Sequence, residues 1–319
     1  MNVRRRLIRT AALAAVTALG TATLAGCSGD AAGAGNTDKF DVVASFYPMA
    51  FLAERIGGSH AHVTTLTSPG QEPHDLELSP KQIGSLEDSD AVLYLKNLQP
   101  SVDEAVAQSP VKTKIDAASL TTLEDHGNEV GGHAAEHDHH EGGEGAGKDP
   151  HIWLDPVRYA QVAEGVGKAF EKADPGHAAD YKKNTAALVK QLNQLDTEFA
   201  DGLAPTRGKV FITTHAAFGY LAERYGLTEE AINGLDPESE PSAARVRDLE
   251  RTAKADGVST VFYETLVSDK TARTIAHDTG LRTDVLDPVE GITEHSRGRD
   301  YFAVQRANLK ALQQALGAK

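Results

Sequence analysis

Short apolar runs alternate with longer amphipathic stretches from residue 40 to the end of the chain. The apolar runs, rich in β-branched and aromatic residues, predict strands at 40–46, 61–66, 91–95, 114–115, 209–214, 229–234, 258–263 and 283–286. The amphipathic stretches predict helices at 47–56, 79–87, just after Ser101, and at 155–172, 174–202, 216–225, 242–255, 269–279 and 300–316. Strands that alternate with helices form mainly parallel sheets covered on both faces, so the chain is predicted to be an α/β protein.

The predicted helix that begins at Asp174-Pro175, assigned as a connecting segment at residues 175–203, is longer than most helices of globular proteins. At about 1.5 Å per residue it would form a rod of roughly 40 Å. We interpret it as a rigid connector between two α/β lobes. The N-terminal lobe is then expected at residues 40–174 and the C-terminal lobe at residues 204–319.

The first 26 residues have the composition of an export signal. Arginines at positions 4, 5, 6 and 9 precede an apolar stretch at 11–24, which is too short to span a bilayer as a mature helix. Small residues then lead to Cys27, the only cysteine, in a pattern that resembles a bacterial lipoprotein signal. That resemblance implies cleavage before Cys27, lipidation of its sulfur and anchoring to the cell membrane. Residues 27–39 would then form a flexible tether between the lipid and the folded part. The alternative to a lipoprotein signal is a plain secretory signal with a chance cysteine.

The charge of the chain restricts its partners. The formal net charge is −14, and without residues 1–26 the remaining 28 basic and 46 acidic residues give −18. So acidic a protein is repelled by nucleic acid and by anionic headgroups, and it suits a cationic ligand. With Cys27 lipidated no thiol remains, which excludes disulfides and cysteine-ligated metal sites.

A histidine-rich segment is predicted at residues 125–147. It is filled with acidic residues and glycines and has almost nothing apolar to bury, so we expect a mobile surface loop. Imidazoles and carboxylates are metal ligands, which makes this segment a candidate auxiliary metal-binding loop rather than a solvated acidic spacer. Its histidines are His126, His133, His137, His139 and His140.

Four further metal-ligand candidates follow predicted strands or the histidine-rich loop: His74, His151, His215 and Asp287. In open α/β sheets ligands bind beyond the carboxyl ends of the strands. Two candidates precede the connecting helix and two follow it, so they would meet in the cleft between the lobes. Three imidazoles and one carboxylate match tetrahedral Zn²⁺.

Two glutamates lie at similar loop or strand-end positions. Glu72 and Glu264 are candidates for carboxylates that fix a histidine tautomer from outside the ligand set, with solvated surface carboxylates as the alternative.

Four motifs resemble those of a known family, the cluster A-I metal-binding proteins of ABC transporters, also described as ZnuA/TroA-type solute-binding proteins. The motifs are EPHD at 72–75, DPHIWLDP at 149–156, THAAF at 214–218 and LDP at 286–288. The resemblance covers residue 40 to the C-terminus. It implies two α/β lobes joined by a long helix, and it carries the ligand role onto His74, His151, His215 and Asp287.

The family resemblance also implies delivery of the metal to a membrane permease driven by a cytoplasmic ATPase. Manganese members have glutamate where this chain has His215, and zinc members have a histidine-rich loop, so Zn²⁺ is favoured over the alternative, Mn²⁺. In some zinc members water or a nearby glutamate takes the place of the carboxylate at the position of Asp287.

Two other classes of function, a zinc hydrolase and a surface adhesin, have less support in the sequence. A secreted zinc hydrolase needs an open coordination position and a general base, and no H-E-x-x-H motif is present. A surface adhesin has only the lipid anchor in its favour. The chain is therefore predicted to be a monomeric, extracytoplasmic binding protein with no catalytic residues.

Overall fold

The computed structural model describes residues 39–126, 148–239 and 241–318. The predicted signal peptide, the lipidation site at Cys27 and nearly all of the tether lie outside the described residues. So do four of the loop histidines: His133, His137, His139 and His140.

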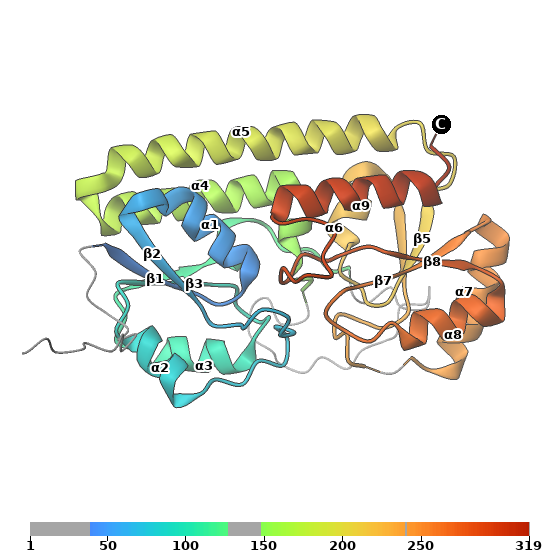
Figure 1. Cartoon of the computed structure of the whole chain (residues 1–319), viewed down its shortest axis with the longest axis horizontal. Coiled ribbons are helices and arrows are strands. Elements are labelled where there is room, and N and C mark those ends of the chain that lie inside the picture. The colour runs from blue at the N-terminus through green and yellow to red at the C-terminus, as the bar shows by residue number, and fades with distance from the viewer. Residues whose placement is uncertain (1–38, 127–147, 240, 319) are drawn as a thin grey trace, which may run out of the picture. The chain divides into compact units, whose positions relative to one another are not determined.

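Two four-stranded sheets, each parallel throughout, form the framework (Figure 1). The first contains β1 (Phe40–Ala44), β2 (Ala61–Thr65), β3 (Ala91–Tyr94) and β4 (Thr113–Asp116). The second contains β5 (Val210–Thr213), β6 (Thr228–Ala231), β7 (Thr260–Tyr263) and β8 (Arg282–Val285). The strand orders are β2-β1-β3-β4 and β6-β5-β7-β8. In both sheets the second strand lies at one edge, beside the first, so the two sheets share one topology.

Helices follow the strands, and all but the last connect one strand to the next. They are α1 (Tyr47–Gly57), α2 (Pro80–Glu87), α3 (Pro100–Gln108), α4 (Pro156–Ala173), α5 (Ala178–Leu203), α6 (Gly219–Tyr225), α7 (Ala243–Asp256), α8 (Lys270–Thr279) and α9 (Tyr301–Ala315). Local signals explain where several begin: the Asp155 side chain accepts a hydrogen bond from Val157 N at the start of α4, and Asp300 accepts one from Ala303 N at α9.

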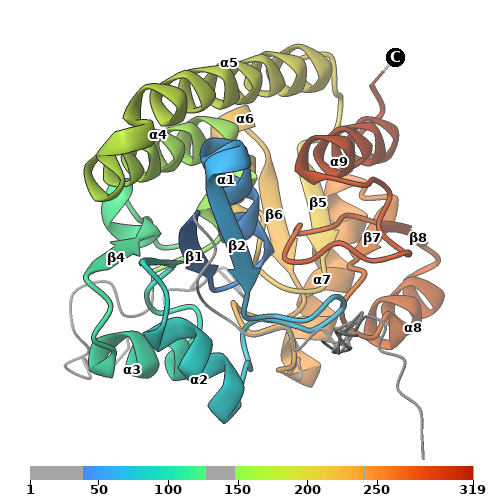
Figure 2. The same cartoon turned by 60° about the vertical axis from the view of Figure 1, so that its left-hand side comes forward.

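Neighbouring residues of each central strand pack on opposite faces of its sheet. Val43 of β1 packs in a cluster with residues of α2 and α3, and Ile212 of β5 packs with residues of α7 and α8. Val42 and Phe211, one residue before each, belong instead to a single large core that both sheets share with α1, α4, α5 and α9. The α/β class with both faces of each sheet covered is confirmed (Figures 1 and 2).

The long helix α5 contacts α1 and α4 as well as α6 and α9. Its buried face is built by residues spaced three or four apart, among them Leu188, Leu192, Leu195 and Phe199. The predicted connecting helix therefore exists, preceded by a short 3₁₀ turn at Pro175–His177, and it packs on helices of both sheets. Among the described residues, no helix combines the length and the apolarity needed to cross a membrane.

Candidate metal centre

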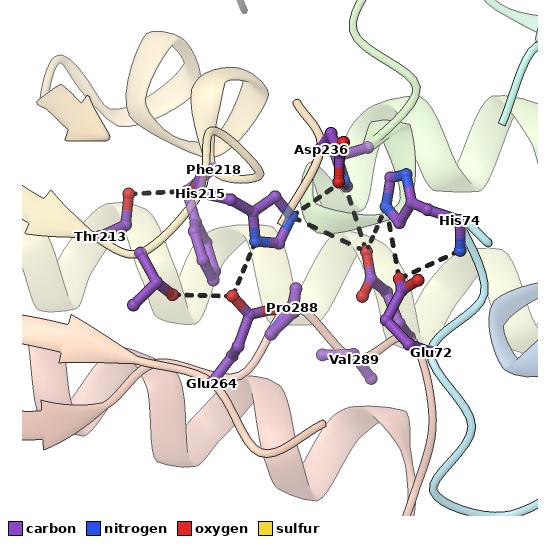
Figure 3. A network of polar contacts seen from close by, with 12 residues as sticks. Glu72, His74, Thr213, His215, Phe218, Asp236, Glu264, Pro288 and Val289 are labelled. Atoms are coloured by element: carbon purple, nitrogen blue, oxygen red, sulfur yellow. Dashed lines mark hydrogen bonds and ion pairs between the residues drawn. The ribbon is translucent and has the colours of Figure 1, made fainter. Parts of the chain in front are cut away.

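Four side chains from distant parts of the sequence converge between the two sheets. His74 lies in the loop after β2, His151 precedes α4, and His215 and Glu290 follow β5 and β8. One potential ligand atom from each lies within 4.8 Å of the others, the one such group of three or more His, Cys, Asp or Glu in the described part of the chain. Figure 3 shows His74 and His215 pointing toward one another across this site.

The Nε2 atoms of the three imidazoles face a common point. The Nε2 atoms of His151 and His215 are 3.4 Å apart. Glu290 Oε1 lies 3.2 Å from His74 Nε2, 3.4 Å from His151 Nε2 and 4.0 Å from His215 Nε2. The carboxylate therefore sits among three rings, as a set of four ligands around one cation requires.

Carboxylates on the other side of two rings fix their orientation. Asp149 Oδ1 lies 2.8 Å from His151 Nδ1. Glu264 Oε1 lies 2.8 Å from His215 Nδ1, a contact that Figure 3 shows. Thr214 Oγ1 donates to the same Glu264 oxygen at 2.7 Å. A carboxylate that accepts from Nδ1–H leaves the Nε2 lone pair directed into the site, which is the arrangement around histidines that bind metals.

Glu72 has a different role from Glu264. Its two carboxylate oxygens accept hydrogen bonds from the backbone N–H groups of His74 and Asp75 at 3.0 and 3.2 Å. It is 4.0 Å from His74 Nε2, so its closer contacts hold the loop that carries His74. His74 and Glu72 are also the side of the site nearest to solvent, with 12% and 14% of their side chains exposed, whereas those of His151 and Glu290 are fully buried.

Burial and charge act against each other at the site. Burial disfavours a protonated ring, but the hydrogen bonds and charges of Asp149 and Glu290 outweigh it and raise the pKa of His151 to about 10. For His215 burial is likewise outweighed, by the Glu264 carboxylate first, and its pKa is raised. Burial alone would raise the pKa of Glu290, yet its contacts with His151 and His74 hold it well below the usual range. Without a metal, protons on His151 and His215 thus stabilise the site.

Asp287, expected from the sequence as the fourth ligand, lies outside the group of converging atoms. Its two oxygens accept hydrogen bonds from Val289 N at 2.8 Å and Thr265 Oγ1 at 2.9 Å. Burial raises the pKa of this carboxyl to about 6. Glu290, which the sequence analysis does not single out, takes the position beside the histidines. The sequence offered only a weak indication of Glu290, because it is a second carboxylate three residues after Asp287 in the same loop.

Asp149 is the other residue that sequence reasoning missed. Fully buried, it contacts His151 through Oδ1 and His126 Nδ1 through Oδ2, at 2.8 and 2.9 Å. His126, predicted as part of the auxiliary loop, also packs against the Tyr220 ring. It therefore belongs to the structure that surrounds His151. The sequence signal for Asp149 was its place two residues before a candidate ligand.

The amide variant Asp149→Asn tests this orienting role. Asparagine keeps the size of the side chain but cannot neutralise or orient the His151 ring as the carboxylate does. Loss of such an outer carboxylate is expected to weaken metal binding about 10- to 100-fold without changing the number of ligands. Metal competition titrations measure the affinity, and Asp278→Asn, at an exposed carboxylate beside His277, is the matched control. Equal affinities of Asp149→Asn and the wild type would contradict the assignment.

The donor set fits a borderline divalent cation. Three imidazole nitrogens and one carboxylate are ligands that Zn²⁺ takes in tetrahedral sites. Two buried oxygens, Glu290 Oε2 and Glu264 Oε2, have no hydrogen-bond partner among the described residues. Unpaired buried carboxylate oxygens are costly and call for a positive charge nearby.

Comparisons with known proteins agree with this geometry. The model of the family ZnuA, described as zinc-uptake complex component A, periplasmic, matches residues 42–315. The chain is 36% identical to the zinc-binding protein AdcA of Streptococcus pyogenes serotype M3, over 86% of this chain and 55% of that protein. It is 33% identical to the high-affinity zinc uptake system protein ZnuA of Bacillus subtilis, over 88% of this chain and 89% of that protein.

A solved structure extends the similarity to the fold. The zinc(II)-bound ZnuA-like domain of AdcA from Streptococcus pneumoniae superposes with a TM-score of 0.71 at 33% identity, and the match covers 87% of this chain and 99% of that domain. The chain thus spans about half the length of the AdcA relatives, 55% of the one from Streptococcus pyogenes.

Proposed function

Because the chain belongs to the ZnuA family, we propose that it captures Zn²⁺ outside the cytoplasm and delivers it to an ABC permease for uptake. The observation that carries this proposal is the convergence of three Nε2 atoms and one carboxylate within 4.8 Å. The relatives, named as zinc-binding and zinc-uptake proteins, support it.

The proposed ligands are His74, His151, His215 and Glu290. Asp149 and Glu264 hold two of the rings with Nε2 directed inward, so little rearrangement is needed on binding. Zn²⁺ would enter and leave past His74 and Glu72, the more exposed side of the site. Release would then require movement of the His74 loop more than of the buried ligands.

The ligand set favours Zn²⁺ over Mn²⁺, because imidazoles suit zinc whereas manganese prefers harder oxygen donors. Four protein ligands leave no coordination position for a reactive water, which argues for a binding protein and against a hydrolase. We further propose that Cys27 carries a lipid that anchors the protein to the outer side of the cell membrane, where the permease and its ATPase receive the metal.

A titration of metal-free protein lacking residues 1–26 tests the proposal. We expect one tight Zn²⁺ per molecule, and a much weaker affinity for Mn²⁺ in competition against a chromophoric chelator. Absence of a tight zinc site, or tighter binding of Mn²⁺ than of Zn²⁺, would overturn the proposed function.

The histidine-rich segment should be separable from this site. All four proposed ligands lie outside residues 127–147. The residues on either side of that range contact each other, through the hydrogen bond from Asp149 N to Glu124 O and the ion pair of Lys148 with Asp125. Replacing 127–147 with a short Gly-Ser linker should therefore leave one tight zinc site and remove additional weak binding.

Calorimetric titration of the deletion variant and the wild type measures both classes of site. His126 must be kept in this variant, because it contacts Asp149. A deletion that begins at residue 125 is expected to bind zinc more weakly than the one that begins at residue 127. Loss of the tight site on deleting 127–147 alone would place that site in the segment and contradict the proposed ligands.

A further inference from the structure

The turn that carries Glu290 contains an unusual backbone conformation. Val289 has φ of 59°, and in the described residues only Asn97 shares a positive φ among residues other than glycine. A β-branched side chain is strongly disfavoured in the left-handed region, because its methyl groups crowd the backbone. Val289 is also fully buried. Such a conformation persists only where the surroundings enforce it, and it is concentrated at functional sites.

Asp287 supplies the most direct restraint on this turn. Its Oδ1 accepts a hydrogen bond of 2.8 Å from Val289 N, which closes the turn across Pro288. Its Oδ2 is fixed in turn by the Thr265 hydroxyl, at 2.9 Å, from the loop after β7. The side chain therefore cannot rotate without breaking one of these bonds.

Residues from two other elements hold the backbone of the turn. Asn308 of α9 accepts from Asp287 N at 2.9 Å and donates to Asp287 O at 2.7 Å. Trp153 Nε1 donates to Pro288 O at 2.7 Å, and Trp153 lies two residues after His151. The turn is thus tied both to α9 and to the segment that carries another ligand.

The direction of Glu290 follows from this arrangement. Reversal of φ at Val289 would turn the next residue away, whereas the observed turn places Glu290 Oε1 at 3.2 and 3.4 Å from the Nε2 atoms of His74 and His151. We propose that Asp287 is a positioning residue: it fixes the peptide group that precedes Val289, the buried Val289 side chain holds the left-handed conformation that follows, and together they place the Glu290 carboxylate among the three histidines. This inference rests on the proposed zinc function and assigns Asp287 a role outside the ligand set.

A conservative variant separates positioning from ligation. Asparagine at 287 keeps an oxygen that accepts from Val289 N but is a poor metal ligand, so Asp287→Asn is expected to bind Zn²⁺ within about tenfold of the wild type. Asp287→Ala removes the acceptor and is expected to weaken binding about 10- to 100-fold. The matched control is Asp284→Ala, three residues earlier on β8, whose carboxylate pairs with Arg297 and should be without effect on zinc.

The visible absorption of bound Co²⁺ reports the ligands directly. We expect the spectrum of Asp287→Asn to match that of the wild type, and those of Asp287→Ala and Glu290→Gln to change in the same way. If Asp287→Ala does not fold, Thr265→Val tests the same restraint: loss of one hydrogen bond to Asp287 should weaken zinc binding about two- to tenfold.

The outcomes are distinct. If Asp287→Asn loses as much affinity as Asp287→Ala, or alters the Co²⁺ spectrum, Asp287 is a ligand and the inference is wrong. If Asp287→Ala, or Thr265→Val in its place, binds zinc like the wild type, Asp287 has no positioning role. If the wild type itself lacks a tight zinc site, it is the proposed function that fails.

Discussion

Replacing His151 by alanine is expected to weaken Zn²⁺ binding about 10²- to 10⁴-fold, the cost of about 3–5 kcal/mol for removing one partner from a buried charged group. His151 is fully buried, and its Nε2 lies 3.4 Å from both His215 Nε2 and Glu290 Oε1. Its removal deletes a ligand and leaves the Asp149 carboxylate buried without the ring that it orients.

Competition against a chelator of known affinity measures this loss. His277→Ala is the matched control, since it removes an imidazole that is 89% exposed and distant from the ligand set. The weak sites of the histidine-rich segment should be unaffected by either change. Tight zinc binding retained in His151→Ala would contradict the proposed centre.

The affinity for zinc is expected to fall by about 10⁴-fold or more between pH 7.5 and 5.5, because bound imidazoles must be neutral and each proton that competes with the metal contributes about tenfold per pH unit. The pKa shifts explain why zinc affinity falls, and does not rise, as the pH is lowered. The pKa values of His151 and His215 are raised, so protons occupy the metal-free site and must leave as zinc binds. Glu290, with a lowered pKa, stays ionised over this range and contributes no proton.

The raised pKa of His151 also means that zinc binding releases protons above neutral pH. With a pKa of about 10, His151 is still protonated in the metal-free site at pH 8, so zinc binding should release about one proton there. Calorimetry in buffers of different ionisation enthalpy counts these protons. Histidines with the ordinary pKa of about 6.5 would release almost none at pH 8. That result would show that Asp149 and Glu290 do not raise the pKa of the ring.

Much of the fold could be predicted from the sequence because the signals are local. The helix and strand types follow from apolar spacing and from residues such as Asp155 and Asp300 that begin helices. The order of the strands did not follow from the sequence. It depends on which faces pack together, and neighbours such as Val42 and Val43 look alike in sequence although they enter different cores.

The candidate site was predictable in part for a related reason. Ligands bind beyond the carboxyl ends of parallel strands, so His74 and His215 could each be named as a candidate on its own sheet. That the two would meet in one cleft followed from the connecting helix between them and from the family resemblance. Glu264 could be suggested by the same rule, and it does lie beside His215. His151 and Asp149 belong to one short motif, but whether the aspartate contacts the ring depends on the backbone between them.

By itself, then, the sequence determined the α/β class and named three histidines as candidates, because apolar periodicity, strand ends and short motifs are properties of neighbouring residues. Only the tertiary structure shows that Glu290, and not Asp287 three residues before it in the same loop, lies within the group of converging atoms. That position depends on the left-handed conformation of Val289, which valine disfavours and no local pattern indicates. Around it, Asn308 and Trp153 hydrogen-bond to the backbone before Val289, Thr265 holds the Asp287 side chain, and the Val289 side chain is buried. The packing of the chain brings these residues together.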